Sequence, residues 1–292
     1  MNQTTYVGRK LDLLKKTLEQ MESVLIAYSG GVDSALLAII ANDVLGANAL
    51  SVTAHSPSLA DRELEEAKDL ANLFHLRHLV IETKEISNPN YIANSIMRCY
   101  FCKIEMYSEL APIADREGLR WIVNGTNMDD LGDFRPGLKA SEKFRVRSPF
   151  LEIELNKAEI RVLAMERKLP IWDKPAQACL SSRVAYGIAI SPKILDRIGK
   201  AEDFLYQAGF LQVRVRHHGN MASIEVGPDE VSRILQEPLR SRVIAKLHAL
   251  GYLEVNIDQA GYRQGNLNRG LPLPKIWTPN EGHAKYNQRA KK

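Results

Sequence analysis

The stretch VLIAYSGGVDSALLAI, residues 24–39, decides the fold because it leads from a strand into a helix through a loop with two glycines. Residues 24–27 form an unbroken apolar run, which is typical of a strand covered on both faces. After the loop, apolar residues recur at helical spacing. The stretch therefore predicts a strand–turn–helix unit of an α/β protein.

The loop SGGVDS, residues 29–34, has the composition of an anion-binding turn. Gly30 and Gly31 allow backbone conformations that are closed to other residues and let a ligand approach closely. The first amides of a helix lack intrahelical partners and carry the positive end of its dipole, so they suit an anion. The alternative is an ordinary turn in which Ser29 or Asp33 caps the helix.

The overall composition argues against several classes of function. No apolar run approaches the about 20 residues needed to span a membrane, and the N-terminal segment lacks the apolar core of a signal peptide. Three cysteines do not indicate a disulfide framework, so we expect a reducing, cytoplasmic environment. The net charge of +4 is too small to indicate nucleic acid by itself and is compatible with a small anionic substrate.

Strand and helix patterns alternate through the first half of the chain. This alternation predicts an α/β fold with a doubly wound parallel sheet. Ligands of such sheets bind at the carboxyl ends of the strands, where Ser29, Thr53 and Thr126 fall. Strands are expected at residues 24–27, 49–57, 77–83, 120–126 and 145–150, and helices at residues 59–74 and 102–118.

The pattern changes after Trp172, which predicts a second, smaller α+β domain. Residues 173–187 have the features of a functional loop, and a helix with clear start and stop signals follows over residues 191–209. Two alternating segments around residues 217–220 predict a hairpin. We therefore expect an ATP-binding domain over 1–172, a substrate and sulfur-transfer domain over 173–265, and a polar, partly disordered tail over 266–292.

The glycine loop resembles the Ser-Gly-Gly-x-Asp-Ser signature of the PP-loop ATP pyrophosphatases, whose domain is adenine nucleotide alpha hydrolase-like. It is not a Walker A loop, since no Lys-Ser/Thr follows the glycines. The resemblance implies cleavage of ATP to AMP and pyrophosphate with Mg²⁺, which leaves an adenylated substrate. The residues expected to contact the nucleotide are Ser29, Gly30, Gly31, Asp33, Ser34, Thr53, Thr126 and Asp130.

Carboxylates near this loop are candidates to assist Mg²⁺, which prefers oxygen ligands. They are Asp33 in the loop, with Asp130 and Asp133 in the segment NGTNMDDLGDFRPG, residues 124–137. The alternative is that these side chains cap helices and turns.

The cysteines leave several chemistries open. Cys99 and Cys102 form a Cys-x-x-Cys on a loop that runs into a helix, and Cys179 lies in the polar segment QACLSSR, where Arg183 would favour a thiolate. Cys-x-x-Cys fits a redox pair, half of a zinc site or part of a cluster. A structural zinc site needs four ligands, so a histidine would have to supply the fourth. Cys179 is otherwise a small apolar residue of the core.

The order of motifs along residues 11–265 resembles the LarE family, which are ATP-dependent sulfur transferases of nickel-pincer nucleotide cofactor synthesis. The motifs are SGGVDS, VTAHSP, RCYFCK, GTNMDDLGDFRPG, RSPF, CLSSR, VRVRHHG, IEVG and GYRQG. The resemblance implies that a pyridinium dicarboxylate mononucleotide is adenylated on a carboxylate and converted to a thiocarboxylate. In the family, the cysteine that matches Cys179 donates its own sulfur and becomes dehydroalanine, so the protein turns over once.

The additional Cys-x-x-Cys departs from that pattern, because one sacrificial cysteine does not need it. Family members with all three cysteines resemble holders of a [4Fe-4S] cluster with three protein ligands, which leaves one iron open to bind and deliver sulfide. We therefore favour a cluster on Cys99, Cys102 and Cys179 over sacrifice of Cys179.

Arginines of the second domain are candidates to bind the substrate's phosphate. Arg214 and Arg216 alternate along one expected strand and thus share a face. With Ser182 and Arg183 they would form a phosphate clamp, in which Glu202 orients one arginine. The alternative is a solvated basic strand face.

Two other functions compete with sulfur transfer to a small nucleotide. Enzymes that thiolate tRNA also join a PP-loop to cysteines, but the modest charge and the missing second Cys-x-x-Cys argue against this function. A non-catalytic nucleotide-binding module is the other alternative, since fold alone does not exclude it. We expect a small anionic nucleotide substrate, no membrane or nucleic-acid partner, and a homo-oligomer.

Overall fold

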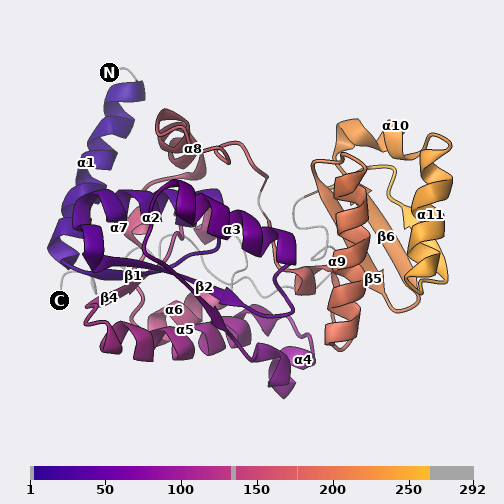
Figure 1. Ribbon diagram of the computed structural model, residues 1–292, viewed down its shortest axis with the longest axis horizontal. Coiled ribbons are helices and arrows are strands. Elements are labelled where there is room, and N and C mark those ends of the chain that lie inside the picture. The colour runs from indigo at the N-terminus through magenta and orange to yellow at the C-terminus, as the bar shows by residue number, and fades with distance from the viewer. Residues whose placement is uncertain (1–2, 133–135, 176, 264–292) are drawn as a thin grey trace.

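The computed structural model describes residues 3–132, 136–175 and 177–263, which form two sheets surrounded by helices (Figure 1). The strands are β1 (Val24–Ala27), β2 (Ala49–His55), β3 (His78–Glu82), β4 (Trp121–Val123), β5 (Val213–His218), β6 (Met221–Val226) and β7 (Glu254–Ile257). The helices are α1 (Gln3–Met21), α2 (Val32–Leu45), α3 (Asp61–Leu73), α4 (Pro89–Ile92), α5 (Arg98–Arg116), α6 (Gly137–Lys143), α7 (Pro149–Glu152), α8 (Lys157–Glu166), α9 (Pro192–Gln207), α10 (Val231–Ile234) and α11 (Leu239–Ala249).

The first sheet has four parallel strands in the order β3-β2-β1-β4, which confirms the predicted α/β class. The chain runs outward from β1 through β2 to β3 and then returns to β4 on the other side of β1. The strand order therefore reverses between β1 and β4, and ligands of such sheets bind in the crevice at the carboxyl ends of these two strands.

The fifth strand predicted over residues 145–150 is wrong. Arg147 forms one isolated parallel bridge to Val123, and α7 begins two residues later at Pro149. Proline has no amide to donate to a strand ladder and fits the first turn of a helix, so the chain leaves the sheet at this point.

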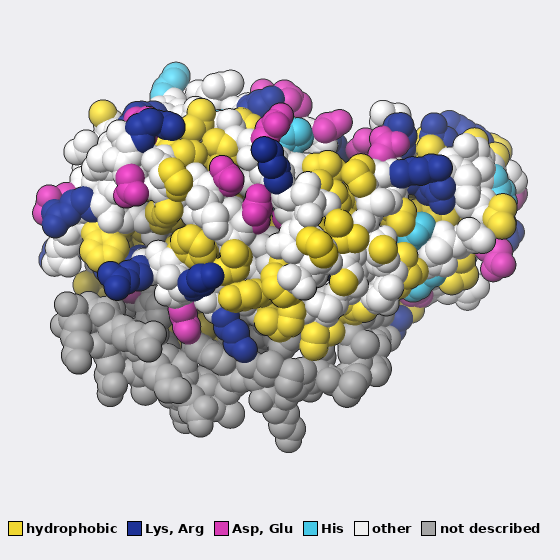
Figure 2. Space-filling model, turned by 90° about the horizontal axis from the view of Figure 1, so that it is seen from below, with side chains coloured by type: hydrophobic (Ala, Val, Ile, Leu, Met, Phe, Trp, Pro, Cys, Tyr) yellow, Lys and Arg dark blue, Asp and Glu magenta, His cyan; other side chains and the backbone are white. Residues whose placement is uncertain are grey.

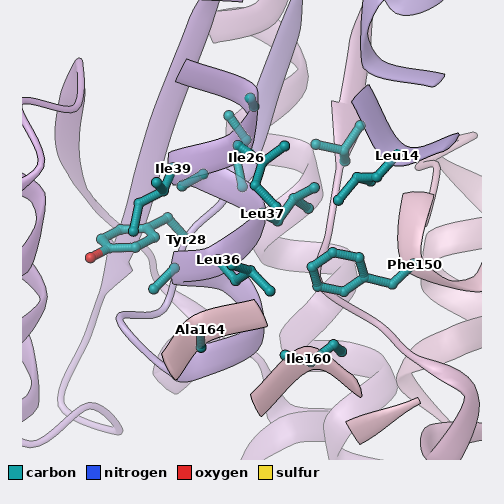
Figure 3. Close-up of a cluster of buried hydrophobic side chains, with 14 of the residues drawn as sticks. Leu14, Ile26, Tyr28, Leu36, Leu37, Ile39, Phe150, Ile160 and Ala164 are labelled. Atoms are coloured by element: carbon teal, nitrogen blue, oxygen red, sulfur yellow. The ribbon is translucent and has the colours of Figure 1, made fainter. Parts of the chain in front are cut away.

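The apolar run of β1 is buried on both faces, as its sequence predicts. Ile26 joins the larger buried cluster, where it meets side chains of α1, α2, α7 and α8 such as Leu37 and Phe150 (Figure 3). Leu25 belongs to a second cluster, which it forms with residues of β2, β4, α5 and α6. Because helices cover both faces, the ends of the strands are the part of this sheet that a ligand can reach.

The second sheet contains β5, β6 and β7 in that order. β5 and β6 form the predicted antiparallel hairpin, which turns at Gly219 with a φ of 70°. β7 runs parallel to β6, and α9, α10 and α11 pack on this sheet (Figure 1). The smaller α+β part is therefore present. Its expected boundary at residue 173 stays a prediction, and the tail over 266–292 lies outside the described residues.

A small buried cluster joins the two parts of the chain. It contains Tyr91 of α4, Leu180 and Val184 of the loop before α9, and Leu195 of α9, with Cys102 packed against it. Apolar burial at this seam fixes the loop that carries Cys179 against the first sheet's helices.

No helix in the described part of the chain is long and apolar enough to cross a membrane. On the face shown in Figure 2, Lys and Arg side chains are scattered among acidic and hydrophobic ones. The expectation that the chain has no nucleic-acid partner stays a prediction.

Candidate active site

The loop between β1 and α2 has its two glycines in different conformations. Gly30 has a φ of 72°, and a Cβ added to it would lie 2.6 Å from Cβ of Ala67 in α3. Gly31 is the N-cap of α2 with a φ of −75° and a ψ of 159°, and an added Cβ would lie 3.5 Å from Oγ of Ser29. Of the two glycines, Gly30 therefore has the positive φ, and only glycine fits there.

Two serine hydroxyls hold this loop in shape. Oγ of Ser34 donates to the carbonyl of Gly31 at 3.1 Å, and it accepts from the amide of Ser29, also at 3.1 Å. The hydroxyls of Ser29 and Ser34 are 3.0 Å apart. The loop is thus preorganised at the N-terminus of α2, where the positive end of the helix dipole attracts an anion.

The segment after β4 packs directly on the start of α2. A Cβ added to Gly125 would lie 2.9 Å from both the carbonyl carbon of Asp33 and the amide nitrogen of Ser34. The side chain of Asn124 accepts from the amide of Thr126 at 3.0 Å, which fixes this turn. The SGGVDS loop and Thr126 therefore lie together where the strand order reverses. Gly125 was not predicted from the sequence. A side chain at this position would collide with α2, and this packing exists only in the tertiary structure.

Asp33 at the start of α2 is held by two side chains from other segments. Its Oδ1 accepts from Nδ2 of Asn127 at 3.3 Å, and its Oδ2 pairs with Nζ of Lys157 at 2.5 Å. Lys157 is the first residue of α8, directly after the Asn156 N-cap of a capping box. Lys157 was not predicted from the sequence. The capping box marks the start of α8, which fixes the position of Lys157.

The other predicted nucleotide contacts are placed differently. Asp130 accepts from the amide of Asn127 at 3.0 Å, which is the turn-capping arrangement. Thr53 is buried, with Oγ1 donating to the carbonyl of Tyr28 at 3.0 Å and lying 2.8 Å from Nε2 of His78. Thr53 therefore braces the first sheet, and its contact with a nucleotide stays a prediction. Asp133 lies outside the described residues.

The Cys-x-x-Cys lies on a helix and not on the loop that we expected. α5 begins at Arg98, so Cys99 and Cys102 are in its first two turns. One helical turn separates residues three positions apart, so both thiols occupy the same side of α5. Cys99 is exposed, and Cys102 and Cys179 are half-buried.

The three thiols lie close enough to act on one another's ionisation. Burial raises the pKa of Cys102, and the neighbouring Cys179 raises it further. Burial also raises the pKa of Cys179, against the lowering effect of the Arg98 guanidinium, while Cys99 raises it and Arg183 lowers it. The structure thus brings the three cysteines of the sequence into one neighbourhood.

The loop that carries Cys179 is anchored by three groups of the first part of the chain. The amide of Leu180 donates to the carbonyl of Ser58 at 2.8 Å. The Tyr91 hydroxyl is 2.6 Å from Oγ of Ser181, and Nη1 of Arg98 donates to the carbonyl of Ser181 at 2.9 Å. These contacts hold the short 3₁₀ helix η4 (Leu180–Arg183) beside α4 and α5.

A single metal ion has no ready site in this neighbourhood. Across residues 3–132, 136–175 and 177–263, no three Cys, His, Asp or Glu side chains converge on a point that would hold one ion. The zinc alternative, in which a histidine would complete a tetrahedral site, stays a hypothesis.

The predicted clamp arginines are buried, which excludes a solvated strand face. Nε and Nη2 of Arg183 donate to the Glu202 carboxylate at 2.9 and 3.0 Å. Nη2 of Arg216 donates to Oε2 of Glu225 at 2.9 Å. Glu202 therefore orients Arg183, and both pairs are nearly closed to solvent.

Arg214 and Ser182 lie next to these pairs. Nη1 of Arg214 donates to Oε1 of Gln177 at 3.2 Å, and its guanidinium lies over the Tyr262 ring, 5.2 Å from the centroid. Nη1 of Arg216 donates to the Ser182 carbonyl at 3.0 Å. All five residues of the predicted clamp thus meet where β5, α9 and η4 come together.

Known proteins resemble this chain along most of its length. The sequence profile of the NAD synthase family matches residues 6–94. A protein of Synechocystis is 44% identical over 90% of this chain and 98% of its own length. The pyridinium-3,5-bisthiocarboxylic acid mononucleotide synthase of Lactiplantibacillus plantarum is 33% identical over 93% of this chain and 98% of its own length. A Methanocaldococcus jannaschii protein is 33% identical over 87% of this chain and 98% of its own length.

The two loop glycines differ in what they tolerate, and this difference is testable by thermal unfolding. Gly30→Ala forces a positive φ on a residue with a Cβ and drives that Cβ into Ala67, so we expect a loss of at least about 1–2 kcal/mol. Gly31→Ala has space and an ordinary φ, so its melting temperature should stay within about a degree of wild type. Equal melting temperatures for the two variants would contradict this assignment.

Proposed function

This chain belongs to the LarE family of ATP-dependent sulfur transferases, and we propose that it converts a carboxylate of a pyridinium dicarboxylate mononucleotide into a thiocarboxylate. The observation that carries the proposal is the match along nearly the whole chain to a synthase whose name states a pyridinium-bisthiocarboxylic acid mononucleotide. In the first step, a substrate carboxylate oxygen attacks the α-phosphorus of ATP and pyrophosphate leaves. In the second, a sulfur nucleophile attacks the acyl carbon and AMP leaves.

The SGGVDS loop and the start of α2 would hold the leaving pyrophosphate. The positive end of the α2 dipole and the open backbone at Gly31 support this role. We propose that Lys157 exchanges its ion pair with Asp33 for a phosphate oxygen when ATP binds. Asp33 would then be free to assist Mg²⁺, which bridges the phosphates and prefers carboxylate oxygens.

The buried arginine cluster would bind the phosphate of the acceptor nucleotide. Arg183 and Arg216 are each neutralised by a glutamate, so their guanidiniums are fixed in place. Arg214 donates to the Gln177 side chain and to the Val213 carbonyl, and its buried guanidinium lies close enough to Arg183 for the two charges to act on one another. An anion between two neighbouring cations is favoured, so we propose Arg214 as the main phosphate contact, with the Ser182 hydroxyl beside it.

We propose that the three thiols of α5 and the η4 loop hold a [4Fe-4S] cluster. The effects of the thiols on one another's pKa support this proposal, because they put three thiols in one neighbourhood, the number that a cluster with one open iron needs. Cys99, Cys102 and Cys179 would be the ligands, and a cluster with three protein ligands supplies an iron with an open coordination position for sulfide. Sacrifice of the Cys179 sulfur is the alternative.

The acceptor, the location in the cell and the oligomeric state are the remaining expectations. We propose a small nucleotide rather than tRNA as the acceptor, because the name of the Lactiplantibacillus plantarum relative states a mononucleotide. A cytoplasmic location stays a prediction, which cell fractionation would test. A homo-oligomer also stays a prediction, which gel filtration of the purified chain would test.

The role of Lys157 is tested by pyrophosphate release. Lys157→Gln removes the cation that pairs with Asp33. We expect the rate of pyrophosphate release to fall by roughly 100-fold, the size of loss that follows when an enzyme loses one hydrogen-bond donor to its transition state. Arg167→Gln is the matched control, because Arg167 follows the last residue of α8 and pairs with Asp43 near the opposite end of α2 from the loop. Equal loss in the two variants would contradict a role for Lys157 at the phosphates.

The phosphate clamp is tested by substrate affinity. Arg214→Gln should raise the dissociation constant of the mononucleotide at least roughly tenfold, since a charge-assisted hydrogen bond contributes about 1.5–3 kcal/mol. ATP affinity should not change. Arg216→Ala should instead lower the melting temperature strongly, because it removes a hydrogen-bonded cation from the buried Glu225 carboxylate. The clamp is misplaced if Arg214→Gln binds the mononucleotide like wild type.

Single cysteine variants separate the cluster from the sacrificial route. With a cluster, alanine at any one of the three positions should abolish iron binding after anaerobic reconstitution, and wild type with excess sulfide should make more than one product per chain. With sacrifice, only Cys179→Ala should be inactive, and reacted wild type should lose about 34 Da, the mass of H₂S. A chain that binds no iron and shows this mass loss would overturn the cluster.

A further inference from the structure

Arg98 at the start of α5 is a buried cation without an acidic partner. Only 3% of its surface is exposed, and within the described part of the chain no carboxylate forms an ion pair with it. Its Nη1 donates to Oδ1 of Asn94 at 2.5 Å and to the carbonyl of Ser181 at 2.9 Å, and both acceptors are neutral. Arg183 and Arg216, which are buried to a similar degree, each have a glutamate.

A buried charge without a counter-charge is costly, so the position of Arg98 calls for an anion nearby. The groups that face it are sulfur atoms and aromatic rings. Burial lowers the pKa of the Arg98 guanidinium, but Cys179 and then Cys99 act in the opposite direction, and its pKa is raised overall. The Tyr186 ring lies on one side, with its centroid 5.6 Å from the guanidinium carbon.

The contacts of Arg98 also fix it relative to Cys179. Ser181, whose carbonyl accepts from Arg98, is two residues after Cys179 and is held a second time by the Tyr91 hydroxyl at 2.6 Å. Cys99 is the next residue after Arg98 on α5. A guanidinium is always charged and is preorganised for binding anions, so it provides a permanent positive charge at this point.

We propose that Arg98, Cys99 and Cys179 form a binding site for small sulfur monoanions, with Arg98 as the counter-ion. The inference rests on the proposed sulfur transfer and deepens it, because hydrosulfide is the simplest anion of this class. Arg98 would be a positioning residue that concentrates the anionic sulfur beside Cys179. Because Arg98 keeps its charge across the physiological range, the site does not depend on the ionisation of Arg98.

The charge of this site is measurable by alkylation of the full-length chain with reduced thiols, without ATP or iron. Iodoacetate and iodoacetamide both react with the Cys179 thiolate and release iodide, but only iodoacetate is an anion. Mass spectrometry assigns each rate to Cys179. Both reagents react with the same thiolate, so the ratio of the iodoacetate rate to the iodoacetamide rate does not depend on the thiolate fraction. This ratio therefore reports the attraction of the anion. We expect this ratio to exceed that of a free cysteine derivative by at least about fivefold in wild type.

Three variants separate charge from structure. Arg98→Gln should lower the ratio to that of the free derivative, and Arg98→Lys should keep most of it. Tyr91→Phe removes the other hydrogen bond to Ser181 without a change of charge, so it should alter both rates alike and leave the ratio unchanged. A wild-type ratio in Arg98→Gln, or an equal fall in Tyr91→Phe, would overturn the proposal.

Competition with an unreactive sulfur anion tests binding itself. Thiocyanate should slow iodoacetamide at Cys179 in wild type and at least about fivefold less effectively in Arg98→Gln. Equal protection in both proteins, or none in wild type, would overturn the site. Since neither assay uses ATP, substrate or a cluster, failure of the proposed sulfur transfer would leave their results unchanged.

Discussion

The close approach of backbones at the first sheet's carboxyl edge is the constraint on which the rest of the site depends. Gly30 allows α3 to contact the loop after β1, and Gly125 allows the segment after β4 to pack on the peptide between Asp33 and Ser34 in the first turn of α2. A methyl group at either position would push these segments apart. Both contacts are therefore needed to bring the N-terminus of α2 and the segment that carries Thr126 together where the strand order reverses.

Charge is handled differently in the two halves of the site. Among the arginines that we propose bind the acceptor, Arg183 and Arg216 are paired with buried glutamates, so the positions of these two cations are fixed. At the loop, Asp33 and Lys157 are each about a quarter exposed and hold one another at 2.5 Å. Exposed pairs are weak and exchange readily for a stronger partner, whereas buried pairs do not. The arrangement therefore favours movement at the nucleotide end and rigidity at the acceptor end.

The sequence best predicts those elements whose conformation is determined by residues close together in the chain. The strand–loop–helix unit at residues 24–39 follows from local apolar patterning, and so does the hairpin around Gly219. The strand expected near Arg147 is wrong because Pro149 starts a helix. The placement of the positive φ at Gly30 and not Gly31 is decided by the packing of α3, which no local pattern reports.

The parts of the site that sequence could not predict join residues far apart in the chain. Lys157 and Asp33 are separated by 124 positions, and the anchors of the Cys179 loop come from Ser58 and Arg98. Motif order indicated that the three cysteines serve one function, but only tertiary contacts bring Cys179 beside the first turns of α5.

The anchoring of the Cys179 loop connects the thiols to the nucleotide crevice. Ser58 follows the carboxyl end of β2, and Ser29 and Thr126 follow the carboxyl ends of β1 and β4. Parallel strands end at the same edge of a sheet, so the carbonyl of Ser58 ties Leu180 to the edge that holds the SGGVDS loop. In the proposed reaction, an acyl adenylate formed at this edge would lie on the same side of the sheet as the loop that carries Cys179. Sulfur transfer competes with hydrolysis of the adenylate, and a short path between the two steps favours transfer.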